Sequence, residues 1–260
     1  MEDNTPATAS PDFIRSLARG LDVIRCFDAD HQKMTLSEVA RLTGLTRATA
    51  RRFLFTLVAL GYARTDGREF ALRPRVMELG YSYLSTLTLP DVVQPHLEAL
   101  ATTVSESCSV AVLDDDDVAY VARVTMKRIM TLTINVGTRF PAYATSMGRV
   151  LLAAQDVDWL DAYMGRTELE PFTGRTLTEP ARFRSMLRRV QAQGYALTDR
   201  ELENGIRSLA CPIRDEAGRV VAAMNISMPA SRASTEALRK EFLPHLRSAT
   251  QSVEADLARR

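Results

Sequence analysis

Three arginines stand close together in the segment LTRATARRFLFTLVALGY, residues 45–62. If this segment is helical, Arg47 and Arg51 lie four residues apart on one face, and Arg52 lies beside Arg51. A guanidinium group can bind the edge of a guanine with two hydrogen bonds, or it can pair with a phosphate. These residue types at this spacing therefore favour contact with a polyanion.

Positive charge is concentrated around this segment. Between Arg41 and Arg75 the chain has eight arginines, and only Asp66 and Glu69 oppose them. The whole chain has a formal net charge of +1, so the remainder is acidic on balance. One local surface is therefore suited to an anionic partner. A basic, solvated helix in a protein-interaction domain is the alternative.

Two shorter helices are predicted before the arginine-rich one. Apolar residues recur at helical spacing over residues 13–27. Thr35 and Glu38 have the spacing of a capping box, which predicts a second helix that ends at Gly44. A helix, a short helix, a tight turn and a longer helix form the pattern of a helix-turn-helix module.

The arginine-rich helix is predicted to begin after the N-cap Thr46 and to end at Gly61. Its apolar residues recur at helical spacing and are expected to face a small core: Phe53, Leu54, Leu57 and Val58. Asp66-Gly67 is the signal of a two-residue turn between short strands, which predicts the wing of a winged helix-turn-helix. The front turns of the helix then enter the major groove of double-stranded DNA, and the wing meets its backbone or minor groove. The predicted DNA-contacting residues are Thr46, Arg47, Ala48, Thr49, Arg51, Arg52, Arg64 and Arg68.

The rest of the chain is predicted to form a larger α+β domain. Helices are expected at residues 91–106, 146–154, 158–164, 179–193 and 235–258, and strands at 108–113, 118–124, 128–136, 195–199, 206–214 and 219–228. Strands in groups of three with helices between them favour an antiparallel sheet. The acidic run 114–117 is interpreted as a solvated hairpin turn rather than a cation site.

Four regions are therefore expected along the chain. Residues 1–12 form a disordered lead, residues 13–74 a winged helix-turn-helix, residues 75–89 a linker helix, and residues 90–260 the α+β domain. No apolar run approaches the roughly 18 residues that a membrane-spanning helix needs, and the polar start is unlike a signal peptide. A cytoplasmic location is expected.

Motifs for catalysis or cofactor binding are not found. The three histidines are scattered without partners at metal-ligand spacing, and no nucleophile, phosphate-loop or dinucleotide motif occurs. We therefore expect neither an enzyme, nor a cofactor, nor a metal. The three cysteines are far apart and odd in number, which argues against a disulfide framework. Cys108 and Cys211 lie in apolar strands, so burial is favoured over the alternative of a redox sensor.

Four segments of the chain carry a family resemblance. They read SLARGLDVIRCF, LTRATARRFLFTLVALGY, GTRFPAYATSMGRVLLA and ELENGIRSLACPIRDEAGRVVAAMNISMP. In these segments the chain from about Phe13 onward resembles the IclR family of bacterial transcription regulators. The first and last look like the branch that controls aromatic-acid catabolism, with its protocatechuate, β-ketoadipate and 4-hydroxybenzoate regulators. The resemblance implies a winged helix-turn-helix, a linker helix and a GAF-like effector-binding domain, in dimers that often pair into tetramers.

The resemblance also implies an effector pocket at the start of a helix. Backbone N–H groups at Ser146, Met147 and Gly148 suit a carboxylate, and relatives hold acidic effectors there. Ordinary helix capping by Thr145 or Ser146 is the alternative. Met147 replaces a smaller residue found in other branches, which argues against a glyoxylate-type ligand.

Two polar residues in the strand MNISMP are further candidates. Asn225 and Ser227 point to one face of that strand. The residues alone favour solvent exposure on an open sheet, whereas the resemblance implies ligand contact. Asp199 and Ser208 correspond to ligand-contacting positions, Arg123 or Arg207 is a candidate partner for a second carboxylate, and Met130 and Tyr143 are candidate apolar walls. For each of the two arginines, a surface or structural role is the alternative.

The predicted protein is thus a regulator that binds operator DNA and a small carboxylic acid effector. An aromatic acid or β-ketoadipate is the expected ligand. A regulator of another carboxylate pathway is one alternative, and a redox-responsive regulator that acts through Cys108 or Cys211 is the other.

Overall fold

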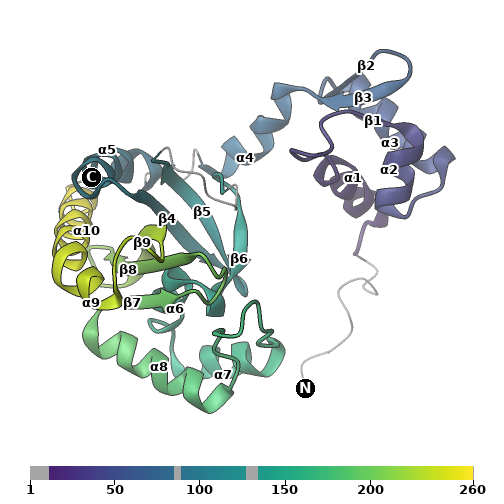
Figure 1. Cartoon of the computed structure of the whole chain (residues 1–260). Helices are drawn as coiled ribbons and strands as arrows, with labels where there is room; N and C mark the ends of the chain where they lie inside the picture. Colours follow the sequence, from purple (N-terminus) through teal and green to yellow (C-terminus); the bar gives the residue numbers. More distant parts are fainter. Residues whose placement is uncertain (1–11, 85–88, 127–133, 260) are drawn as a thin grey trace. The chain divides into compact units, whose positions relative to one another are not determined.

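The computed structural model describes residues 12–84, 89–126 and 134–259 (Figure 1). The chain divides into two compact units, Met1–Tyr83 and Leu84–Arg260, called unit 1 and unit 2 below. Across the described residues, every helix is too short or too polar to cross a membrane.

Unit 1 contains a small three-stranded antiparallel sheet and three helices that pack beside it. Its elements are α1 (Arg15–Arg25), β1 (Met34–Thr35), α2 (Leu36–Thr43), α3 (Arg47–Ala59), β2 (Ala63–Thr65) and β3 (Glu69–Leu72), with strand order β1-β3-β2. The third strand, β1, was not predicted, because two residues are too short a run for a period-2 pattern. A 3-10 turn (Pro74–Val76) and α4 (Met77–Leu84) follow β3. The predicted linker continues into residues 85–88, which lie outside the described residues.

The predicted caps of α2 and α3 are confirmed. The N–H of Thr35 donates to Glu38 Oε2 at 2.7 Å, and the N–H of Glu38 donates back to Thr35 Oγ1 at 3.4 Å. Gly44 ends α2 with φ +66°, a left-handed conformation that favours glycine. Leu54 and Leu57 of α3 are buried in the core of unit 1, as predicted from their spacing.

The wing hairpin differs from its prediction by one residue. The N–H of Asp66 donates to the carbonyl of Glu69 at 3.3 Å, so Gly67 and Arg68, rather than Asp66 and Gly67, are the central residues of the turn. The Asp66 carboxylate accepts the N–H groups of Glu69 and Arg68 at 2.8 and 2.9 Å, and these bonds lower the pKa of Asp66. The side-chain bonds hold Asp66 at the strand end, where the sequence pattern had placed it inside the turn.

Unit 2 is built on a six-stranded sheet in which every neighbouring pair is antiparallel. Its strands are β4 (Ser107–Asp114), β5 (Asp117–Val124), β6 (Arg139–Pro141), β7 (Ala196–Asp199), β8 (Ile206–Arg214) and β9 (Val220–Pro229), in the order β6-β5-β4-β9-β8-β7. The predicted α+β class is confirmed. The central position of β9, between β4 and β8, gives its side chains neighbours on both sides.

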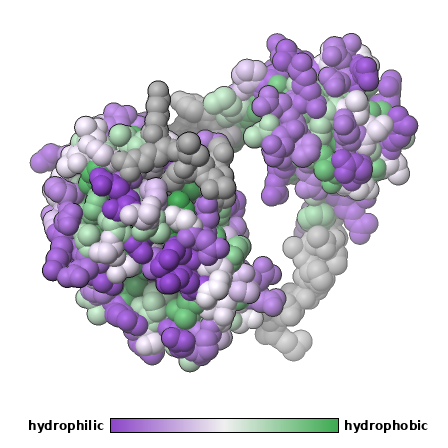
Figure 2. Space-filling model, in the orientation of Figure 1, coloured by the Kyte–Doolittle hydropathy of each residue, from purple (hydrophilic) through white to green (hydrophobic). Residues whose placement is uncertain are grey.

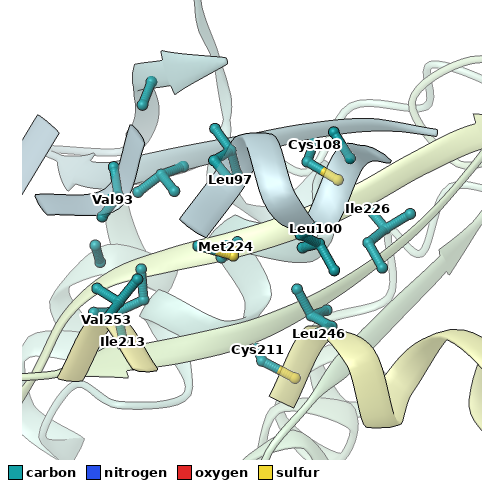
Figure 3. Close-up of a cluster of buried hydrophobic side chains, with 14 of the residues drawn as sticks. Val93, Leu97, Leu100, Cys108, Cys211, Ile213, Met224, Ile226, Leu246 and Val253 are labelled. Carbon is teal, nitrogen blue, oxygen red and sulfur yellow. The ribbon is translucent and has the colours of Figure 1, made fainter. Parts of the chain in front are cut away.

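Helices cover both faces of this sheet (Figure 1). The helical elements are α5 (Leu89–Val104), a 3-10 turn (Ala142–Ala144), α6 (Ser146–Leu152), α7 (Val157–Arg166), α8 (Pro180–Gln193), α9 (Thr235–Ala237), a π-helical turn (Leu238–Phe242) and α10 (Leu243–Leu257). Helices α5 and α10 pack on one face over an apolar core, and Figure 3 shows Leu97, Leu246, Met224 and Ile226 meeting there. Helix α6 packs on the other face.

Two predicted elements of unit 2 were wrong in part. The expected strand over residues 128–136 lies mainly outside the described residues, and residues 134–136 are not in a strand; β6 pairs with β5 instead. The single long helix expected over 235–258 is interrupted by the π-helical turn. Pro244 explains the interruption, because it has no N–H to donate and its ring clashes with a regular preceding turn.

Candidate functional site

The first candidate site is the exposed front of α3. Thr46 caps the helix, accepting the N–H of Thr49 at 3.2 Å, and the two hydroxyls lie 2.8 Å apart. Arg47, Arg51 and Arg52 are exposed, whereas Ala50 between them is fully buried against the core. The helix is thus anchored by one face and presents its basic residues on the other.

An aromatic contact orients one of these arginines. The guanidinium carbon of Arg51 lies 4.6 Å from the centroid of the Phe55 ring, one turn further along α3. Phe55 is 42% exposed, and its ring meets Phe70 of the wing edge-on at 5.6 Å between centroids. Phe55 therefore links α3 to β3 of the wing hairpin and positions Arg51. The sequence pattern had left Phe55 unassigned, although a spacing of four residues from Arg51 was visible.

The predicted DNA-contacting arginines pair with no carboxylate in the part of the chain that the structure describes. Among the described residues, no ion pair forms with Arg47, Arg51, Arg52, Arg64 or Arg68, and all five are exposed. Arg75 behaves differently, because its Nη1 donates to the carbonyl of Leu60 at 3.1 Å and its Nε to Glu78 at 3.2 Å. Arg75 thus supports the fold, while the other five leave uncompensated positive charge. Hydrophilic residues dominate the visible surface of unit 1 in Figure 2.

The second candidate site is a cavity above one face of the unit 2 sheet. Met224 and Ile226 of β9 point into the apolar core beneath α5 and α10, so Asn225 and Ser227 lie on the opposite face (Figure 3). This alternation was predicted. The expectation of solvent exposure was wrong, because both polar residues are buried. The cover is the segment of the chain around α6 and the loop after β7.

Strand register places further polar residues on this face. Directly opposed residues in an antiparallel pair share a face. Asn225 is opposed by Ser109, and Ser109 in turn by Arg123 on β5. In the next row, Ser227 is opposed by Ser107 and by Ser208, and Ser208 by Thr198. A continuous polar floor therefore crosses β5, β4, β9, β8 and β7.

Three buried side chains on three elements form a hydrogen-bonded chain at this floor. Asn225 Nδ2 donates to Ser208 Oγ at 2.9 Å, and Ser208 Oγ lies 2.8 Å from Ser146 Oγ at the start of α6. Ser208 Oγ also donates to the carbonyl of Ile226 at 3.2 Å. The three residues were predicted separately, and the structure brings them together.

Gly148 allows α6 to pack closely against the 3-10 turn that precedes it. A Cβ atom at Gly148 would lie 2.1 Å from the carbonyl oxygen of Ala142, a distance that no side chain tolerates. The N–H of Gly148 is occupied by Thr145 Oγ1 at 2.9 Å, so the capping alternative is correct for this donor. Met147 is fully buried in the apolar cluster behind the helix. Of the three predicted residues at this helix start, only Ser146 faces the cavity.

A buried ion pair fixes the loop that closes the cavity. Arg149 is almost fully buried, and its Nη1 and Nη2 donate to the two carboxylate oxygens of Glu201, the first at 2.8 Å. Its Nε donates to the carbonyl of Tyr143 at 2.9 Å. Thr176 Oγ1 donates to the carbonyl of Glu201 at 2.6 Å, which holds the loop from its outer side. The arginine thus joins α6 to the loop between β7 and β8.

The cavity is lined by Tyr120, Ile134, Ala144, Thr145, Ser146, Thr198, Glu201, Leu202, Glu203, Ile206, Ser208, Asn225 and Ser227. Four of these had been predicted: Ser146, Ser208, Asn225 and Ser227. Glu201 and Glu203 were visible in the segment ELENG, but an acidic side chain gave no reason to place it beside an acidic ligand. The apolar lining residues carried no signal, because their spacing is that of ordinary core.

The other predicted effector residues lie elsewhere. Arg207 and Asp199 pair with each other, with Nη2 and Oδ1 2.7 Å apart. Burial alone would raise the pKa of Asp199, but hydrogen bonds from Arg200 and Arg207 outweigh it and lower the pKa. The Tyr143 hydroxyl donates to the carbonyl of Glu170 at 3.0 Å, away from the lining residues. Met130 lies outside the described residues.

Arg123 is outside the lining residues but on the same polar floor. Its Nη1 donates to Ser109 Oγ at 3.0 Å and its Nε to Thr125 Oγ1 at 3.1 Å. Burial lowers its pKa, and no carboxylate among the described residues pairs with it. A half-buried guanidinium bonded to hydroxyls can accept an incoming anion.

Metal-ligating side chains do not gather at either site. In the described part of the chain, no group of three or more His, Cys, Asp or Glu residues is arranged to hold a metal ion.

Two family sequence patterns match the chain. The pattern described as "IclR helix-turn-helix domain" matches residues 16–67, and "Bacterial transcriptional regulator IclR C-terminal" matches residues 81–255. A Pseudomonas putida protein named "Pca regulon regulatory protein" is 42% identical over 247 residues, which cover 95% of this chain and 85% of the relative.

Solved structures agree with these matches. A transcriptional regulator from Rhodococcus sp. RHA1 has a TM-score of 0.85 at 55% identity, with 94% of this chain and 98% of that chain covered. An IclR homolog from Microbacterium hydrocarbonoxydans, solved in complex with 4-hydroxybenzoate, has a TM-score of 0.81 at 28% identity, with 93% and 98% covered.

Proposed function

The chain belongs to the IclR family of DNA-binding bacterial transcription regulators, and we propose that a small aromatic carboxylic acid bound in the unit 2 cavity controls its hold on operator DNA. The observation that carries the proposal is the buried chain of Asn225, Ser208 and Ser146, three polar side chains from three elements that meet at one cavity. Two relatives support the ligand class: one is named for the Pca regulon, and another was solved with 4-hydroxybenzoate.

The proposed DNA contacts come from α3 and the wing. Arg47, Arg51 and Arg52 enter the major groove, with Ala48 and the N-cap pair Thr46 and Thr49 at the same end of the helix. Arg64 and Arg68 of the wing meet the backbone or the minor groove. These five exposed arginines form no ion pair with a described carboxylate, which supports these roles because phosphate stabilises such positive charge.

The effector carboxylate requires positive charge, and Arg123 supplies it. Among the lining residues are two carboxylates, Glu201 and Glu203, and no lysine or arginine. Arg149 neutralises Glu201. An acid ligand is therefore proposed to place its carboxylate toward the β4–β5 end of the polar floor, where Arg123 and Ser109 can donate to it.

Ligand binding is proposed to act on DNA through α4. In a homodimer, two copies of α3 bind two half-sites, and a ligand that favours one arrangement of the two unit 1 copies changes operator affinity.

An exposed apolar stripe at the start of α1 offers a surface for the second copy. Ile14, Leu17 and Leu21 form this stripe and are 64%, 62% and 47% exposed. Leu17→Glu is expected to shift the protein toward monomer in analytical ultracentrifugation, and an unchanged sedimentation coefficient would exclude this stripe. Because operator DNA is its partner, we place the protein in the cytoplasm and assign it no catalysis.

A thermal-shift screen tests the proposal. A ligand that binds only the folded protein stabilises it by about 2.7 kcal/mol at 100 times its Kd, which raises the melting temperature. Benzoates, hydroxybenzoates and aliphatic dicarboxylic acids form the panel. A shift with non-aromatic acids alone would favour a regulator of another carboxylate pathway, and no shift with any acid would refute the proposed effector.

A further inference from the structure

Two buried acceptor atoms of the cavity are left without donors. Glu203 Oε2 and Asn225 Oδ1 are shielded from solvent, and no described residue donates a hydrogen bond to either. Both residues line the cavity. A buried polar atom without a partner costs free energy, and native structures leave few such atoms unexplained. Both unpaired atoms are acceptors, so the cavity lacks a hydrogen-bond donor for them.

One of the two acceptors, Glu203, lies at the opposite end of the floor from Arg123. Glu203 belongs to the loop between β7 and β8, at the outer end of the sheet order, whereas Arg123 is on β5. Asn225 on β9 lies between them. The floor is therefore electrically asymmetric, with a guanidinium toward one end and an unpaired carboxylate oxygen at the other.

We propose that Glu203, with Asn225, reads a hydroxyl group of the effector, and that the cavity selects a hydroxylated monocarboxylic acid over a dicarboxylic one. This rests on the proposed function, which supplies the ligand carboxylate at the Arg123 end. The hydroxyl at the far end of the ligand donates to Glu203 Oε2 or Asn225 Oδ1 and removes the donor deficit. A second carboxylate in the same place would meet the Glu203 carboxylate, and like charges in a buried site repel.

The proposal distinguishes between candidate acids that the sequence left as equal alternatives. 4-Hydroxybenzoate and 3,4-dihydroxybenzoate each have one carboxylate and a hydroxyl at the far side of the ring, so both fit the asymmetry. β-Ketoadipate has a carboxylate at each end and no hydroxyl donor, so it does not. Benzoate has the carboxylate alone and leaves both acceptors unpaired.

Isothermal titration calorimetry on the full chain tests this with matched ligands. 4-Hydroxybenzoate and 3,4-dihydroxybenzoate are expected to bind about 10-fold to 100-fold more tightly than benzoate, and β-ketoadipate more weakly than either hydroxy acid. Equal affinity for 4-hydroxybenzoate and benzoate, or tighter binding of β-ketoadipate, overturns the proposal while leaving an acid-binding pocket intact. If none of the four acids binds, the proposed function itself fails.

Two substitutions of Glu203 are expected to change the ligand preference in different ways. Glu203→Leu removes the acceptor, so the preference for 4-hydroxybenzoate over benzoate is expected to fall to within about 3-fold. Glu203→Gln keeps a carbonyl acceptor and removes the charge, so it is expected to retain the hydroxyl preference and to gain about 10-fold in affinity for β-ketoadipate. Glu216→Gln, in the exposed turn before β9, is the matched control and leaves the whole ligand series unchanged. Should Glu203→Leu unfold, Glu203→Gln decides alone: an unchanged ranking and unchanged β-ketoadipate affinity overturn the role of Glu203.

Discussion

The two candidate sites differ in how the chain builds them. The proposed DNA-facing surface uses one exposed helix end and one hairpin, all within residues 46–68, and its arginines form no ion pair with a described carboxylate. The cavity draws its lining from residues 120–227, and its polar side chains are buried and bonded to one another. A surface for a large polyanion can be formed by residues that are close in sequence. An enclosed small-molecule site instead needs residues that only the folded sheet brings together.

This difference predicts opposite responses to substitution. A change at an exposed arginine of α3 is expected to weaken DNA binding and to leave the fold alone, because these side chains are solvated. A change around the cavity disturbs bonds on which unit 2 itself depends. The two sites should therefore separate cleanly in experiments that measure stability and binding side by side.

The largest expected effect is on the buried ion pair of unit 2. Arg149→Met leaves Glu201 with an uncompensated carboxylate, and breaking such a buried pair costs about 3–5 kcal/mol. Chemical denaturation followed by circular dichroism measures the loss. The matched control is Arg184→Met, whose surface pair with Asp161 is worth less than about 1 kcal/mol. A stability change at Arg149 as small as that at Arg184 would mean that the pair does not hold the cavity loop.

Substitution of either of the two adjacent arginines on α3 should weaken DNA binding and leave the stability of the protein almost unchanged. Arg51→Ala and Arg52→Ala are each expected to weaken operator binding by about 1–3 kcal/mol while leaving the unfolding free energy within about 0.5 kcal/mol. Fluorescence anisotropy at several salt concentrations measures the affinity, and a lost phosphate contact lowers the salt slope by about 1. Arg188→Ala, an exposed arginine of α8, is the control. Unchanged DNA affinity in both α3 variants would remove this helix from the interface.

The same contrast explains what the sequence could predict. The roles of Thr46, Gly44 and the α3 arginines can be predicted from residues within four positions of each. The structure confirms the predicted caps and the predicted exposure of the arginines. No local pattern identifies Glu203, because its place in the same cavity as Asn225 depends on the order of β7, β8 and β9. The turn at Gly67-Arg68 and the π-helical turn before Pro244 fall between these cases. The turn signal located the hairpin and the helical pattern located the last helix, but side-chain bonds shifted the turn by one residue and a proline interrupted the helix.

A smaller effect is expected where cavity contacts can be removed without opening the fold. Asn225→Leu combined with Ser227→Ala keeps the approximate volume of the floor and deletes its hydrogen bonds, so effector affinity should fall about 10-fold to 100-fold while operator binding without ligand is retained. Calorimetric titration of 4-hydroxybenzoate measures this loss. Ser252→Ala on the exposed side of α10 serves as the control. An unaltered titration would show that the ligand binds away from β9.

The smallest expected effect is on the cysteines, and it tests whether unit 2 senses anything other than a ligand. Burial raises the pKa of the Cys108 and Cys211 thiols to about 12, with Glu106 adding to the rise at Cys108. Both thiols are therefore protonated at pH 7, and the thiolate is the form that oxidants attack. Operator affinity after mild peroxide treatment should therefore stay within about 2-fold of the untreated protein.

Loss of operator binding after peroxide treatment would indicate which cysteine is oxidised. Loss of operator binding in peroxide that disappears in a Cys108→Ala, Cys211→Ala variant would require one of these strands to open in solution, because neither thiol is reachable in the folded sheet. If the loss persisted in that variant, Cys26 of unit 1 would be the remaining cysteine. Its thiol is less buried than the other two, although burial also raises its pKa. The oxidation experiment therefore distinguishes a responsive sheet in unit 2 from a local effect at the DNA-binding unit.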